Sequence, residues 1–139
     1  MRIQTILATL AISACATSPP DSNWSQLEGC WIDASDAVPP ASMVWRSVPD
    51  RPGVRAGTWA VNYTSDDPDI VQFNLEPTAN GMQLCERIPG TPEGCIRAVL
   101  YGEHANDGDA VFSVNADTLE FGYDGAPAPF YIGRRGGCA

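Results

Sequence analysis

At 139 residues the chain is long enough for one domain with a hydrophobic core, and 44% of its residues are hydrophobic. Its formal net charge is −9, and its basic residues are all arginines. So acidic a chain is a poor ligand for nucleic acid and for anionic lipid head groups. The sequence contains no recognisable catalytic motif, cofactor-binding motif or metal-ligand spacing. We therefore expect a non-enzymatic protein without a cofactor, a metal ion or a nucleic-acid partner.

The N-terminus, MRIQTILATLAISAC, has the features of an export signal. Arg2 precedes an apolar run that is too short for a membrane-spanning helix, which needs about 20 residues. The stretch Ile12-Ser13-Ala14-Cys15 resembles the lipobox of bacterial lipoproteins. The resemblance implies that residues 1–14 are removed and that Cys15 is lipidated with acyl chains such as palmitate. The alternative is an ordinary secretory signal that is cut near Ala16.

A lipidated Cys15 would determine where the protein resides. Two or more acyl chains anchor a protein stably, whereas one chain does not. Ala16 stands where an aspartate would be the familiar signal for retention in the inner membrane. We therefore expect attachment to the periplasmic face of the outer membrane. Residues 15–23, CATSPPDSN, have the composition of a flexible tether, and residues 24–139 form the folded domain.

Four further cysteines, Cys30, Cys85, Cys95 and Cys138, predict two disulfides in an exported chain. Three pairings are open. Cys85 and Cys95 flank a turn rich in proline and glycine, so they could bridge a hairpin. Cys30 and Cys138 would meet if the first and last strands were neighbours. A zinc site or a catalytic cysteine is less consistent with the sequence, because no Cys-x-x-Cys pair occurs and the single histidine, His104, lies in a turn-like segment.

The rest of the chain alternates strand-like runs with turn-forming clusters. The clearest run is IVQFNLEPT (70–78), in which apolar and polar residues alternate with a period of two. Further runs lie at 57–64, 95–102, 118–125 and 130–135, the last with Phe130 and Ile132 on one face. We predict an all-β fold of eight or nine strands, an antiparallel up-and-down barrel, because closure removes the two exposed sheet edges.

Gly29-Cys30-Trp31 is similar to the G-x-W signature that opens the lipocalin and wider calycin barrels. The resemblance implies that Trp31 plugs one barrel end and that an arginine of the last strand, Arg134 or Arg135, packs across its ring. The surrounding LEGCW also resembles the opening of periplasmic barrel inhibitors with an L-x-G-x-W stretch.

Two functions follow as expectations. The lipocalin resemblance implies a carrier of a small apolar ligand, and the second resemblance implies a protein-binding envelope factor such as a protease or lysozyme inhibitor. Five aromatic residues could line a ligand pocket or simply fill the core: Trp45, Trp59, Tyr63, Phe73 and Phe121. Glu86 is expected on the same strand face as Leu84. It could pair with Arg87 or Arg97, or it could orient a ligand in an apolar cavity.

Overall fold

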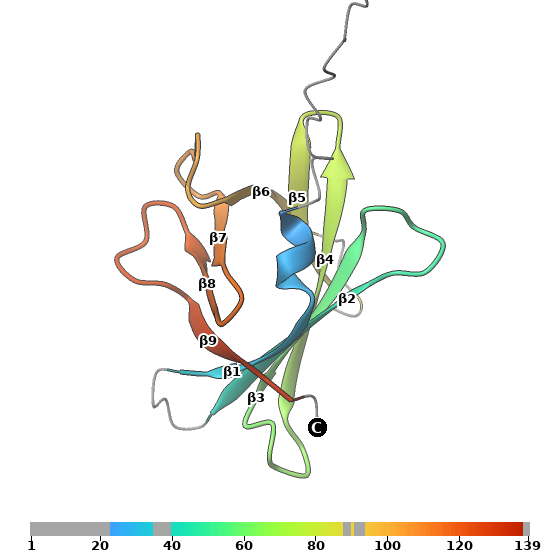
Figure 1. The fold of residues 1–139 in the computed structure, drawn as a ribbon, viewed down its shortest axis with the longest axis vertical. Helices are drawn as coiled ribbons and strands as arrows, with labels where there is room; N and C mark the ends of the chain where they lie inside the picture. The colour runs from blue at the N-terminus through green and yellow to red at the C-terminus, as the bar shows by residue number, and fades with distance from the viewer. Residues whose placement is uncertain (1–22, 35–39, 88–89, 91–93, 138–139) are drawn as a thin grey trace, which may run out of the picture.

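The computed structural model describes residues 23–34, 40–87, 90 and 94–137. The predicted signal peptide, Cys15 and Cys138 lie outside the described residues. Within those ranges, no helix is long and apolar enough to cross a bilayer. The described chain is an all-β barrel whose strands join into one closed ring (Figure 1), which confirms the predicted fold class.

The described part of the chain contains one short 3₁₀-helix followed by nine strands. The helix η1 spans Trp24–Leu27. The strands are β1 Gly29–Asp33, β2 Ala41–Ser47, β3 Arg55–Val61, β4 Asp69–Thr78, β5 Gly81–Arg87, β6 Gly94–Leu100, β7 Ala110–Val114, β8 Thr118–Tyr123 and β9 Tyr131–Gly136. Each strand pairs with the next, and β9 pairs with β1 to close the ring (Figure 1).

One strand contact departs from the antiparallel prediction. β6 and β7 run parallel, with Ala98 opposite Ala110 and Leu100 opposite Phe112. In a ring of purely antiparallel neighbours the strand direction alternates at every step, so the number of strands must be even. A closed ring of nine strands therefore requires at least one parallel pair, and β6–β7 supplies it.

The segment 101–109 carries the chain back so that β7 can start beside β6. Tyr101 and His104 both adopt positive φ angles, 56° and 54°, which reverse the chain within a few residues. Asp109 holds the returning segment in place. Its carboxylate lies 3.0 Å from Nη1 of Arg97 in β6 and accepts the backbone N–H of Asn106 at 2.8 Å. This short connection replaces the longer crossover that parallel strands usually need.

The period-two pattern sets which side chains fill the barrel. In β2, Met43 and Trp45 are buried, and in β4, Phe73 and Leu75 are buried. Trp45 lies opposite Gly57 of β3. A Cβ at Gly57 would lie 2.7 Å from the indole ring of Trp45, so the glycine leaves the space that this ring occupies.

Two predicted strands end differently from the expectation. β3 stops at Val61 because Asn62 takes a left-handed φ of 57°, so Tyr63 lies beyond the strand. In β9, Tyr131 faces the interior and Ile132 does not, which is the reverse of the predicted face. Phe130 precedes the strand, and its ring reaches the core from the preceding loop, with its centroid 4.9 Å from that of Trp59.

The helix η1 and Trp31 close one end of the barrel. Trp31 is fully buried, and its Nε1 donates to the carbonyl oxygen of Leu27 at 2.9 Å. The guanidinium carbon of Arg135 lies 4.2 Å from the Trp31 ring centroid. The same guanidinium donates at 2.8 Å to three carbonyl oxygens, those of Gln26, Glu28 and Ala116. Arg135 thus joins β9, η1 and the turn before β8.

A buried arginine lies at the same end. Arg55 begins β3 and is only 5% exposed. Its Nε lies 3.8 Å from Oε1 of Glu28, the residue that follows η1. A buried guanidinium needs a negatively charged partner, so Glu28 ties η1 to the barrel wall a second time.

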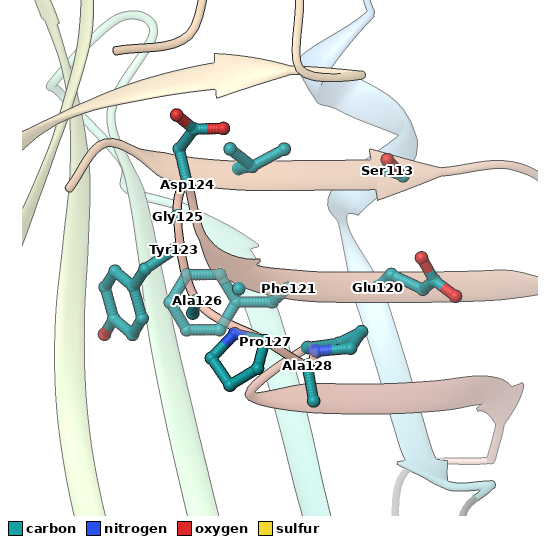
Figure 2. Close-up of a pocket in the computed structure, with 12 residues that line it drawn as sticks. Ser113, Glu120, Phe121, Tyr123, Asp124, Gly125, Ala126, Pro127 and Ala128 are labelled. Atoms are coloured by element: carbon teal, nitrogen blue, oxygen red, sulfur yellow. The ribbon is translucent and has the colours of Figure 1, made fainter. Parts of the chain in front are cut away.

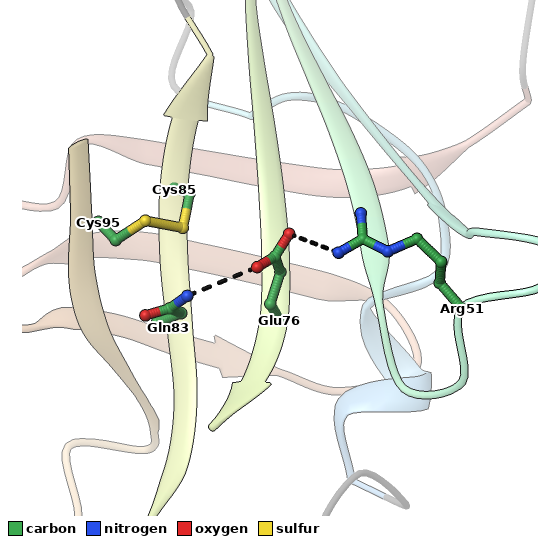
Figure 3. Close-up of polar contacts among 5 residues, drawn as sticks. All are labelled: Arg51, Glu76, Gln83, Cys85 and Cys95. Atoms are coloured by element: carbon green, nitrogen blue, oxygen red, sulfur yellow. Dashed lines mark hydrogen bonds and ion pairs between the residues drawn. A yellow bond between two sulfur atoms is a disulfide. The ribbon is translucent and has the colours of Figure 1, made fainter. Parts of the chain in front are cut away.

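The two disulfides predicted from the cysteines involve residues of the barrel wall. Cys85 and Cys95 lie opposite each other on β5 and β6 and form a disulfide, as the sequence predicts (Figure 3). Cys30 is also disulfide-bonded. Its predicted partner, Cys138, lies outside the described residues.

Polar contacts strengthen the outer face next to the disulfide. Glu76 of β4 forms an ion pair with Arg51 at 3.0 Å, and Gln83 of β5 donates to the same carboxylate at 3.5 Å (Figure 3). These contacts link the β2–β3 connection to two neighbouring strands. Because the Arg51 side chain is about half exposed, the ion pair adds only a small stabilisation, at most about 1 kcal/mol.

Candidate functional site

The five aromatic residues predicted to line a ligand pocket do not gather around one cavity. Trp45 and Phe121 are 1% exposed and belong to the packed core. Trp59 packs against that core and against Phe130. Tyr63 lies in a separate groove of about 230 Å³ beside Cys30 and Ser42. Phe73 alone of the five lines a pocket that opens from the barrel interior.

Side chains fill the closed half of the barrel. The Phe112 ring stacks on Phe121 with centroids 4.6 Å apart and meets Trp45 and Trp24 edge-on. Trp24, which belongs to η1, is 4% exposed, so the helix forms part of this packing. Small barrels are just wide enough to be filled by side chains in this way. A deep ligand cup therefore does not fit this half of the barrel.

The opposite half contains a pocket of about 320 Å³ that we call the mouth pocket. Its lining comes from four strands, β4, β5, β6 and β8, and consists of Phe73, Leu84, Glu86, Gly94, Cys95, Ile96 and Tyr123. Known small-molecule sites span roughly 300 to 1,000 Å³, so the mouth pocket suits a small ligand.

Strand register explains why the pocket forms there. On the inner face, Phe73 lies opposite Glu86, and Leu84 lies opposite Ile96. Gly94 lies opposite Glu86 on the other side, and a Cβ at Gly94 would meet no atom within 4 Å. Because β7 pairs with β6 only from Ala98 onward, no described strand lies on the far side of the first residues of β6. A missing side chain and a missing strand neighbour together leave this space.

Among the described residues, the lining of the mouth pocket is apolar apart from one charged side chain, that of Glu86. Ile96 is 37% exposed, which is unusual for a large aliphatic side chain on an inner barrel face. Glu86 is exposed at the pocket. Tyr123 also lines the pocket, and its pKa is raised, first by burial and then by the negative charge of Glu86.

One predicted role for Glu86 was an ion pair with Arg97, and the structure does not show this pair. Arg97 points to the outer face, where it binds Asp109 and donates to the carbonyl oxygen of His104 at 3.1 Å. His104 itself is exposed in the 101–109 connection. Within the described residues, Glu86 forms no ion pair with Arg97 or with Arg87, the other predicted partner, so its carboxylate can meet a ligand at the pocket.

Two other hollows differ from the mouth pocket in chemistry. One, of about 270 Å³, lies on the outer face of β7 and β8, where segment 124–129 turns back along β8 (Figure 2). A Cβ at Gly122 would lie 3.2 Å from Cα of Pro129, so the segment packs closely on the strand. The other, of about 590 Å³, lies at the closed end between two hairpin turns. The described part of its lining, which includes Pro52, Pro77 and Met82, carries no charged or aromatic side chain.

The described ranges contain no group of three His, Cys, Asp or Glu side chains that could hold a metal ion. Among the mouth-pocket residues, sequence reasoning had singled out Phe73 as ligand-lining and Glu86 as a candidate, but it missed Gly94 and Ile96. The unbroken alternation around Ile96 looks the same whether the inner face is filled or hollow. Only the register that sets Gly94 beside Glu86 reveals the space.

A scan against protein-family models, a search of curated proteins and a search of solved structures found no match to this chain.

Proposed function

We propose that this protein is a lipid-anchored binding protein of the bacterial cell envelope that takes up a small, largely apolar ligand in the mouth pocket. The observation that supports this proposal is the pocket itself, an opening of about 320 Å³ with an exposed Ile96 on its inner wall. Burying such apolar surface against a ligand gives roughly 25 cal/mol per Å² before the costs of association.

Filling the pocket tests this function. Gly94→Trp places a large side chain where a Cβ meets no atom within 4 Å, so the barrel should tolerate it. With phenylbutanol as the probe and the full-length protein in mild detergent, calorimetry should show binding that the variant weakens about tenfold or more.

Ala79→Trp is the matched control, because it places the same side chain in the pocket at the closed end. It should leave the affinity for phenylbutanol unchanged. Equal binding by wild type and Gly94→Trp, or loss of binding in Ala79→Trp, would contradict the mouth pocket as the ligand site.

The anchor is tested separately. Cys15→Ser removes the thiol that the lipobox resemblance designates for lipidation, so the protein should move from the membrane fraction to the soluble periplasmic fraction. Ala16→Asp should keep the anchor and shift the protein from outer to inner membrane. Continued membrane fractionation of Cys15→Ser would exclude lipidation at that residue.

The packed closed half favours a second candidate function, a protein-binding role such as inhibition of a protease or lysozyme. A barrel filled by Trp45, Phe112 and Phe121 offers its surface more readily than its interior. Titration of lysozyme and of serine proteases with the purified protein tests this role. Stoichiometric inhibition that persists in Gly94→Trp would favour the second function over the first.

A further inference from the structure

The charge in the mouth pocket defines the ligand more closely. We infer that the mouth pocket binds a small organic cation, an amine or ammonium group on an apolar body, with the Glu86 carboxylate as its counter-ion. This inference rests on the proposed function and adds the chemical class of the ligand.

Glu86 is placed to meet a ligand rather than the protein. It lies on the inner face of β5, between Phe73 on one neighbouring strand and Gly94 on the other. Within the described ranges, Glu86 forms no ion pair or hydrogen bond, and the nearby Arg97 is held by Asp109 on the outer face. An apolar ligand that covered this carboxylate without pairing it would impose a desolvation cost. A cationic ligand removes that cost.

The aromatic side chains of the pocket suit a cation as well. Phe73 and Tyr123 both line it, and a cation near an aromatic face is attracted by the ring quadrupole. The Tyr123 hydroxyl is protonated near neutral pH because a tyrosine pKa is ordinarily about 10, and burial and the Glu86 charge raise that pKa further. Tyr123 therefore adds no competing negative charge and offers a neutral hydroxyl to the ligand.

The net negative charge of the protein also favours a cationic ligand. A net charge of −9 on 139 residues raises the local concentration of cations around the protein and lowers that of anions. This long-range effect favours every cation over every anion. The local contribution of Glu86 must therefore be separated from it by experiment.

Three probes with one apolar body and different head groups make that separation: phenylbutylamine, phenylbutanol and phenylbutyrate. Calorimetry with the full-length protein should show that the amine binds most tightly and the carboxylate least. Glu86→Gln should weaken the amine about fivefold, the size of a partly exposed ion pair, and leave the alcohol unchanged. Glu120→Gln is the matched control, because it removes one exposed carboxylate from the outer face of β8 and should leave all three affinities unchanged.

The outcomes separate this inference from the function on which it rests. If the three probes bound equally, and if their binding were unchanged in Glu86→Gln but lost in Gly94→Trp, the preference for a cation would be overturned. The proposed binding function would then still hold. The preference for a cation would also be overturned if phenylbutyrate bound most tightly of the three probes. If Glu86→Gln and Glu120→Gln weakened the binding of the amine equally, the effect would come from the net charge of the protein. The role of Glu86 as counter-ion would then be overturned. Absence of binding by all three probes would contradict the proposed function itself.

Discussion

Trp31→Ala should lower the free energy of unfolding by about 3 to 5 kcal/mol, the usual cost of truncating a fully buried tryptophan. Three losses combine at this position. The indole fills the closed end without any solvent exposure, its N–H donates to Leu27, and its face carries the Arg135 guanidinium. Because this ring and its partners form one of the attachments of η1 to the barrel, beside the buried Trp24 and the Glu28–Arg55 ion pair, the helix should be held less firmly in the variant. Urea unfolding followed by circular dichroism measures the loss.

Trp59→Ala is the comparison for Trp31→Ala. Trp59 is only partly buried and packs near the open end against Phe130. Its truncation removes the same number of atoms but less buried contact, so the loss of stability should be clearly smaller. Equal losses in the two variants would contradict the assignment of Trp31 as the plug of the closed end.

Arg135→Ala should cost about 2 kcal/mol, from several hydrogen bonds of modest net value and one cation–π contact at a partly exposed site. The side chain donates to carbonyl oxygens of η1, of the residue after it and of the turn before β8. The η1 region and the turn before β8 are far apart in the sequence, so one guanidinium fixes how the barrel end is assembled. Urea unfolding gives the loss, and hydrogen exchange of the η1 amides should accelerate in the same variant.

Arg134→Ala provides an unusually close control for Arg135→Ala. The two arginines are neighbours on β9 and exposed, yet only Arg135 lies over the Trp31 ring. Both variants remove the same charge from the same strand. Arg134→Ala should change stability by no more than about 0.5 kcal/mol, as surface substitutions usually do. A similar loss in both variants would show that strand charge, and not the contact with Trp31, stabilises the barrel end.

Much of the strand pattern could be predicted from the sequence, because half-buried strands show alternation directly. The run at 70–78 matches β4 closely, and the run at 118–125 contains β8. The 3₁₀-helix η1 was not predicted, since four residues are too few to show a helical period. The face of β9 was also mispredicted, because Phe130 belongs to the loop and not to the alternation that starts at Tyr131.

Other features depend on relations that no local pattern contains. A closed ring of nine strands needs a parallel contact, which lies here between β6 and β7, and the sequence was compatible with eight strands as well as nine. The choice between Arg134 and Arg135 depends on the register of β9 against β1, in which Arg135 lies opposite Trp31.

The candidate site was foreseen only in part. Phe73 and Glu86 were noted from their strand face, but whether that face was filled or hollow depends on what lies opposite. Gly94 is informative only once the register sets it beside Glu86. Trp45, by contrast, turned out to be core, because Gly57 gives the indole its room.

A two-dimensional NMR titration of the ¹⁵N-labelled full-length protein with phenylbutylamine shows where on the barrel the amine binds. Binding at the mouth pocket should give saturable shifts at the amides of Glu86, Gly94, Ile96 and Tyr123, with the indole N–H of Trp31 unmoved at the closed end. Shifts centred on Ala79 and its turn, or no saturable shift at the mouth pocket, would contradict it.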